Sequence, residues 1–189
     1  MKNNAAVIVK PANGRQSKSG LFLIDGAGIP VCLTPLDKKE LDAVFAAMFN
    51  CNDLNEEKSP ILELTLLDDR AMENLHRESL GCEGPTNILA FPAGTYSALK
   101  PNIPGPACRH PLPTGFPGGK DQSVFLGSLA LSVDTLHREC FLYGQDAREH
   151  CIRLLAHGLA HLLGYDHGPA MWAVTDQFED AALAVLQKI

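Results

Sequence analysis

Apolar residues along this chain recur with two different spacings, and these predict strands and helices in alternation. Short apolar runs bounded by turn residues are typical of strands, whereas apolar residues at every third or fourth position mark one face of a helix. We therefore expect strands at 21–24, 31–33, 61–66, 86–91 and 124–131, the last with a bulge at Gly127. We expect helices through 41–48 (capped by Thr34 or Asp37), 68–78, 134–143, 146–163 and 171–187.

Strands interleaved with helices predict an α+β fold in a single domain, 19–189, in which a small mixed β-sheet packs against several helices. A chain of 189 residues is long enough to bury a sizeable core. Residues 1–18 are polar and poorly patterned, so we expect a mobile N-terminal arm. Residues 93–122 are rich in proline and glycine and lack periodicity, so we expect a long loop inserted into the domain.

The composition is that of an ordinary globular protein, with 46% hydrophobic and 20% charged residues. No apolar run approaches membrane-spanning length and the N-terminus lacks a signal-peptide core, so we expect a cytoplasmic protein without a membrane partner. The six cysteines form no C-x-x-C pair, which argues against a disulfide framework or a cysteine-bound zinc. The net charge of −6 argues against a surface that coats nucleic acid, although local basic patches permit a polyanion at one place.

Three histidines with metal-ligand spacing occur in the segment His157-Gly-Leu-Ala-His161-Leu-Leu-Gly164-Tyr-Asp-His167. Two histidines four residues apart on a helix lie on the same face, one turn apart. Gly164 favours the left-handed turn that ends a helix, so that His167 on the returning segment reaches the same point. Three imidazoles and one open position are typical of a catalytic zinc. We therefore predict one Zn²⁺ with three histidine ligands and a water, on a helix at the centre of the domain.

The spacing H-x-x-x-H-x-x-G-x-x-H is also the frame of the metzincin proteases, in which a glutamate after the first histidine serves as general base. Gly158 occupies that position here, so the frame predicts a metal site without the base of that class. A metalloprotease-like hydrolase nevertheless stays an alternative on the spacing. His150 lies two turns before His157 and is too far along the helix to share the ion, so we interpret it as a core residue or one behind the ligands.

Two blocks of this sequence resemble the YbeY family of bacterial ribosomal RNA maturation endoribonucleases. The family's block H-G-x-x-H-L-x-G-Y-D-H is met at 157–167. A second block, an arginine followed by P-T-[DN]-V-L-S-F-P, is similar to Arg77 and the segment Pro85-Thr-Asn-Ile-Leu-Ala-Phe-Pro92. The resemblance covers roughly residues 60–187 and departs from the family at Ser128, where an aspartate is usual.

The resemblance implies a metal-dependent endoribonuclease that prefers single strands and acts in ribosomal RNA processing and ribosome quality control. Its partners would be single-stranded RNA, above all ribosomal RNA or its precursor, and ribosomal proteins. The metal would activate water or a phosphate oxygen for phosphodiester cleavage. The alternative in another class is a non-catalytic ribosome assembly factor whose metal is structural, in which case removal of the metal unfolds the protein.

Arg77 is the predicted catalytic and phosphate-binding residue. A guanidinium is always charged and can hold two phosphate oxygens at once. On composition alone, a surface arginine paired with Glu73 or Glu78 of its own helix is the simpler interpretation. The resemblance favours the phosphate role.

Three further residues have predicted supporting roles. Thr86 and Asn87 are expected to bind substrate by shaping the cleft through hydrogen bonds to the backbone. Asp166 is expected to orient a neighbouring metal ligand from behind, or else to cap the turn.

Overall fold

A mixed five-stranded sheet forms the middle of the computed structural model, which describes residues 7–9, 20–25, 33–51, 59–93 and 123–188. The strand order is β1-β2-β3-β5-β4. β2, β3 and β5 run parallel, whereas β1 and β4 pair antiparallel with β2 and β5. The strands are β1 Val7–Val9, β2 Gly20–Asp25, β3 Ser59–Leu67, β4 Ile88–Pro92 and β5 Ser123–Ser132.

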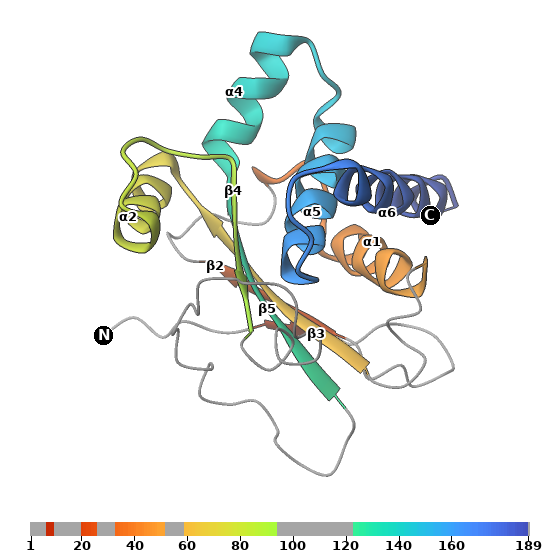
Figure 1. The fold of residues 1–189 in the computed structure, drawn as a ribbon. Coiled ribbons are helices and arrows are strands. Elements are labelled where there is room, and N and C mark those ends of the chain that lie inside the picture. The colour runs from red at the N-terminus through yellow and green to blue at the C-terminus, as the bar shows by residue number, and fades with distance from the viewer. Residues whose placement is uncertain (1–6, 10–19, 26–32, 52–58, 94–122, 189) are drawn as a thin grey trace.

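Helices cover both faces of this sheet, as Figure 1 shows. The helices are α1 Lys38–Cys51, α2 Asp69–Leu80, α4 Val133–Tyr143, α5 Ala147–Leu162 and α6 Pro169–Leu186. One apolar cluster joins α1, α5 and α6 to one face of the sheet, and a smaller cluster joins α2 to the other face. The helix that carries two of the three histidines, α5, is buried almost all round and contacts β4, β5, α4 and α6. The predicted α+β fold with this helix at its centre is confirmed.

A bulge in β5 decides which side chains face α5. The pairing of β5 with β3 skips Leu126, so that Phe125 and Gly127 oppose the consecutive residues Ile61 and Leu62. Because of this extra residue, Leu126 and Leu129 both join the larger cluster although they lie an odd number of residues apart. Gly127 has φ +140°, and a Cβ there would lie 2.2 Å from the Phe91 carbonyl oxygen, so the bulge requires glycine. The predicted bulge is confirmed.

The helix ends follow the predicted capping chemistry. Asp68 accepts a hydrogen bond from the Ala71 amide at the start of α2, and Asp146 accepts from two amides at the start of α5. Of the two candidates for the α1 cap, Asp37 is the one used, because its carboxylate accepts a hydrogen bond from the Glu40 amide. Gly144 ends α4 in the left-handed conformation, with φ +62°.

Some expected elements differ from the structure. The strand expected from residue 86 begins at Ile88, whose amide donates a hydrogen bond to the side-chain oxygen of Asn87. Leu33 lies outside any strand, and residues 31–32 and 94–122 lie outside the described residues. In the N-terminal stretch, Val7–Val9 form a strand that was not expected there, whereas the rest of the expected arm is not described. Within the described residues, none of the helices combines the length and the apolar character needed to span a membrane.

Candidate metal centre

The first two histidines of the predicted site lie on α5, one helical turn apart. The Nε2 atoms of His157 and His161 are 3.2 Å apart. Two nitrogens bound at about 2.0–2.1 Å to one tetrahedral zinc lie about 3.3 Å from each other. The α5 backbone therefore presents this pair of nitrogens at the separation that zinc requires.

A Schellman turn after α5 brings the third histidine back. The amide of Gly164 donates to the carbonyl of His161, and the amide of Tyr165 donates to the carbonyl of Ala160. Gly164 is in the left-handed conformation with φ +84°, as the sequence predicted. The ligand nitrogens of His157, His161 and His167 consequently lie within 4.8 Å of one another.

The hydrogen bonds and burial of the histidines favour the form that binds a metal. The Nδ1 of His161 lies 3.1 Å from the Tyr165 carbonyl oxygen, so Nδ1 carries the proton and Nε2 keeps its lone pair. Burial lowers the pKa of His157, and the charges that the other two histidines can carry lower it further. Burial also lowers the pKa of His161, against the opposing effect of its bond to Tyr165. Neutral imidazole is the ligand form, so the site suits a metal ion.

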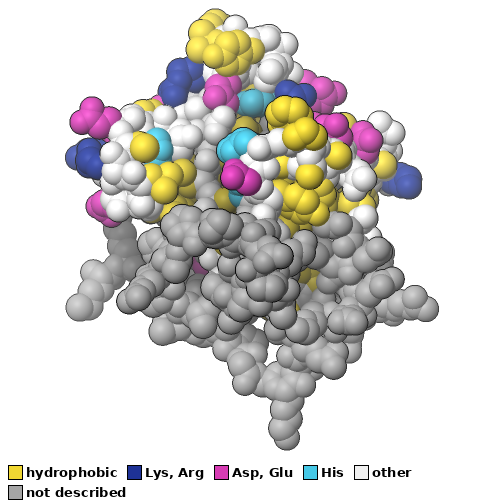
Figure 2. All heavy atoms as spheres, in the orientation of Figure 1, with side chains coloured by type: hydrophobic (Ala, Val, Ile, Leu, Met, Phe, Trp, Pro, Cys, Tyr) yellow, Lys and Arg dark blue, Asp and Glu magenta, His cyan; other side chains and the backbone are white. Residues whose placement is uncertain are grey.

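The opening of the site to solvent distinguishes it from a closed structural metal site. His157 and His161 are half-buried, and His167 is exposed. On the face drawn in Figure 2, several histidine side chains reach the surface. Three protein ligands with an exposed side leave room for a water or a substrate oxygen.

Gly158, which replaces the protease glutamate, faces the sheet at a close contact. A Cβ at this position would lie 2.8 Å from the Ile88 Cδ1 and 2.8 Å from the Leu129 Cδ2. A glutamate here would have to displace β4 and β5 side chains before its carboxylate reached the histidines. A side chain at this position would therefore point toward β4 and β5, and the ends of the Ile88 and Leu129 side chains would have to shift.

Comparison with known proteins places the chain among relatives of known name. The model of the family described as Endoribonuclease YbeY matches residues 33–183. This chain belongs to the YbeY family. The matched residues include both the histidine segment and the block that begins at Arg77, so the resemblance seen in the sequence is confirmed.

Relatives with the same name cover most of the chain. The Endoribonuclease YbeY of Nitratidesulfovibrio vulgaris is 46% identical over 155 residues, which are 79% of this chain and 87% of the relative. That of Oleidesulfovibrio alaskensis is 43% identical over 151 residues, 78% of this chain and 84% of the relative. A Thermotoga maritima protein solved in solution has a TM-score of 0.53 at 13% identity, covering 89% of this chain and 91% of that one, so it is a likeness of fold alone.

The second YbeY block contributes Arg77, which the structure does not bring into contact with the histidines among the described residues. Arg77 is exposed on α2 and donates a hydrogen bond to the Asn74 side chain, and not to Glu73 or Glu78. Nevertheless, α2 packs on Leu89 of β4 from one face, while α5 packs on Ile88 from the other. Arg77 and the three histidines therefore flank the same edge strand.

Asn87 and Thr86 lead into that edge strand. The Asn87 side chain donates to the Glu139 carboxylate at 3.2 Å, and its backbone carbonyl accepts from the Ser132 amide. Glu139 in turn lies 2.8 Å from the Nε2 of His150. These bonds link the start of β4 to α4 and α5, and no local pattern in the sequence predicts them. Thr86 is half-buried beside it, and a substrate contact of either residue stays a prediction.

Asp166 and Ser128 are the last two positions that the sequence singled out. The Asp166 carboxylate accepts a hydrogen bond from the His167 amide at 2.8 Å and lies 3.5 Å from the His167 Nδ1. Asp166 therefore caps the turn and also lies behind a ligand. Ser128 shares the face of Ala130 through the alternation of β5, which is the face opposite α5. The residue that departs from the family pattern thus faces away from the metal helix.

Proposed function

We propose that this protein is a zinc-dependent endoribonuclease that prefers single-stranded RNA and acts in the cytoplasm in ribosomal RNA maturation and ribosome quality control. Membership of the YbeY family supports RNA as the substrate class. The carrying observation is the open group of His157, His161 and His167, in which two nitrogens have the separation of zinc ligands and all three lie within 4.8 Å of one another. Ribosomal RNA, its precursor and ribosomal proteins are the proposed partners.

Zinc in this site would supply a Lewis acid for phosphodiester cleavage. The chain's own residues prepare the site for it. The Tyr165 carbonyl fixes the tautomer of His161, and burial keeps His157 and His161 neutral. Asp166 holds the turn that carries His167. These contacts set the direction of the ligand nitrogens before RNA binds.

Arg77 is proposed to bind the phosphate backbone from the other side of the edge strand. RNA that crosses β4 would meet the histidines from α5 and the guanidinium from α2. Arg77 is exposed, so it can turn from Asn74 to a phosphate without breaking a buried contact. Asn87 and Thr86 are proposed to fix the start of this strand, with Asn87 acting through its bonds to Glu139 and Ile88.

The two alternatives predict different behaviour. A peptidase of metzincin type needs a base where Gly158 packs against Ile88 and Leu129, so the packing argues against it. An assembly factor with a structural metal predicts that chelation unfolds the protein. Here α5 is anchored by apolar contacts to β4, β5 and α6, so we expect the fold to survive metal removal.

The test combines metal content with chelator-sensitive cleavage of single-stranded ribosomal RNA. We expect wild type to carry one zinc and to cut, His161→Ala to lose both, and Arg77→Ala to keep zinc but stop cutting. Arg77→Lys keeps the charge but cannot form bidentate hydrogen bonds to a phosphate, so we expect it to cleave RNA weakly. His137→Ala is the matched control, because His137 is an exposed histidine of α4.

Each result that contradicts the expected pattern favours one of the two alternatives. Zinc without cleavage by any variant would favour the assembly factor, as would unfolding by chelator. Casein cleavage that disappears with chelator would favour the peptidase. The product ends report the attacking group, because a 5′-phosphate indicates water and a 2′,3′-cyclic phosphate indicates the RNA's own 2′-hydroxyl.

A further inference from the structure

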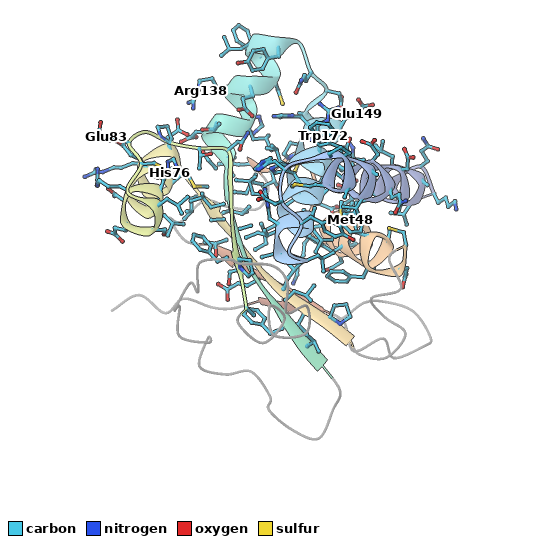
Figure 3. All side chains as sticks on the ribbon, in the orientation of Figure 1. Met48, His76, Glu83, Arg138, Glu149 and Trp172 are labelled. Atoms are coloured by element: carbon cyan, nitrogen blue, oxygen red, sulfur yellow. The ribbon has the colours of Figure 1, made fainter. Side chains whose placement is uncertain are left out.

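Trp172 is a large aromatic side chain that the fold leaves in solvent. It lies on the first turns of α6 with 62% of its surface exposed, where Figure 3 labels it. Tryptophan is highly buried on average, so a solvent-exposed indole suggests a binding role. The buried face of α6 is formed instead by Met171, Val174 and Phe178.

The backbone places Trp172 close to the metal centre. Its amide donates a hydrogen bond to the carbonyl of Gly168 at 3.0 Å, and Gly168 directly follows His167. Only one helical turn therefore separates the indole-bearing residue from the neighbour of a metal ligand.

The packing of α5 against α6 fixes the side of α6 on which Trp172 lies. Arg153, His157 and His161 are four residues apart and form one stripe of α5. Arg153 is paired at 3.4 Å with Glu179 of α6. Trp172 precedes Glu179 by seven residues, or two turns, and so shares its side of the helix. The indole lies on the flank of α6 that faces the histidine stripe.

We propose that Trp172 is a stacking surface for one base of the RNA strand, next to the phosphate at the metal centre. This inference rests on the proposed function and names a substrate-binding residue for it. An indole face stacks on any base, which suits an enzyme that prefers unpaired strands, because paired bases have both faces covered. A single aromatic side chain is too small for a protein interface, which needs a contiguous apolar patch of several hundred Å².

Phe141 provides a matched control for exposed aromatic surface. It is even more exposed, at 87%, but it lies at the end of α4 that leads into the start of α5. The start of α5 is about 15 Å along the helix axis from His157. Phe141→Ala likewise removes an exposed aromatic side chain, at a place where the proposed strand does not pass.

The experiment uses the fact that Trp172 is the only tryptophan of the chain. Zinc-loaded protein is mixed rapidly with a short single-stranded oligoribonucleotide, and tryptophan fluorescence is read before cleavage. We expect quenching that saturates with RNA concentration. In cleavage assays we expect Trp172→Ala to raise KM by about 5- to 150-fold, the effect of losing one stacked base. Trp172→Phe should restore part of the loss, and Phe141→Ala should leave KM unchanged.

An oligonucleotide with one abasic position sharpens the result. The abasic site that the indole faces should weaken wild type as much as Trp172→Ala does, and should weaken Trp172→Ala no further. If wild type cuts RNA without quenching and Trp172→Ala keeps its KM, the stacking role is wrong and the proposed nuclease stands. An equal loss in Phe141→Ala also overturns it. If wild type neither binds nor cuts RNA, the proposed function fails and this inference fails with it.

Discussion

Two carboxylate–histidine pairs lie at the two ends of α5, and their surroundings differ sharply. Near its start, Glu139 lies 2.8 Å from His150, and the two side chains are 24% and 9% exposed. Past its end, Asp166 lies 3.5 Å from His167, and the two side chains are 95% and 67% exposed. The same two chemical groups thus form a tight buried pair at one end and a loose exposed pair at the other.

The histidines of α5 differ in the groups that their Nε2 atoms contact. The Nε2 of His150 is occupied by Glu139, which also accepts from Asn87, so this pair closes a structural link between α4, α5 and β4. The Nε2 atoms of His157 and His161 face each other across 3.2 Å. Two facing lone pairs repel each other, so nitrogens at this distance are stabilised either by a proton on one of them or by a metal cation between them. The paired nitrogen of His150 joins elements of the fold, whereas the converging nitrogens of His157 and His161 could hold a metal ion.

Exchanging the two kinds of histidine for alanine is the most severe test of this comparison. We expect His157→Ala to lose zinc and cleavage while keeping its fold. Its zinc affinity should fall by more than about 100-fold, which is the upper effect of removing a residue that only hydrogen-bonds to a ligand. His150→Ala should keep one zinc per chain and cleave at the wild-type rate. It should lower the free energy of unfolding by about 1–3 kcal/mol, because Glu139 loses its bond to His150 and keeps only the one from Asn87. Metal analysis and denaturant unfolding measure the two effects. Loss of zinc in His150→Ala would contradict the division of roles.

Glu139→Gln tests the buried pair from the acid side, with a smaller effect. The amide keeps the shape but loses the charge that strengthens the bonds to His150 and Asn87, so we expect about 1–2 kcal/mol less stability. Zinc content and KM should not change. Glu83→Gln is the control, because Glu83 is an exposed carboxylate in the turn after α2 (Figure 3). A shift in KM without a shift in stability would instead place Glu139 in the RNA site.

Asn87→Ala distinguishes a structural role from the predicted substrate contact. Its side chain bonds Glu139 and the Ile88 amide, so we expect about 1 kcal/mol of lost stability. The losses of Asn87→Ala and Glu139→Gln should not add, because the two residues share a bond. Chemical unfolding of both single variants and the double variant gives this coupling. A raised KM with unchanged stability would support direct binding of RNA by Asn87.

The grouping of the three histidines could be predicted from the sequence because its geometry is local. His157 and His161 share a face through the helical period, and Gly164 favours the turn that returns His167. The polar link of Asn87, Glu139 and His150 could not be predicted in this way, because Asn87 and Glu139 are 52 residues apart. They come together because the Asn87 carbonyl, just before β4, accepts a hydrogen bond from the amide of Ser132, the residue that caps α4.

The same limit applies to two other features. The sequence shows only that glycine stands at position 158, where a metzincin has its glutamate. The close contact of this position depends on Ile88 and Leu129, which lie on separate strands. The side of α6 that carries Trp172 can be related to α5 only through a contact between the two helices, the Arg153–Glu179 pair. Features fixed by one helix and its turn were therefore predicted, and features fixed by the docking of elements were not.

Asp166→Asn has the smallest expected effect, and it tests the exposed pair. The asparagine oxygen can still accept from the His167 amide, so the turn is kept, and only the carboxylate charge near the His167 Nδ1 is lost. That charge is almost fully in water, where a pair of this kind contributes little. We expect zinc affinity, measured by competition with a chelator, to fall by less than about 10-fold, below the usual effect of a partner behind a ligand. A fall of about 100-fold would mean that the carboxylate becomes buried against His167 when zinc binds, and the two ends of α5 would then be more alike than their surroundings indicate.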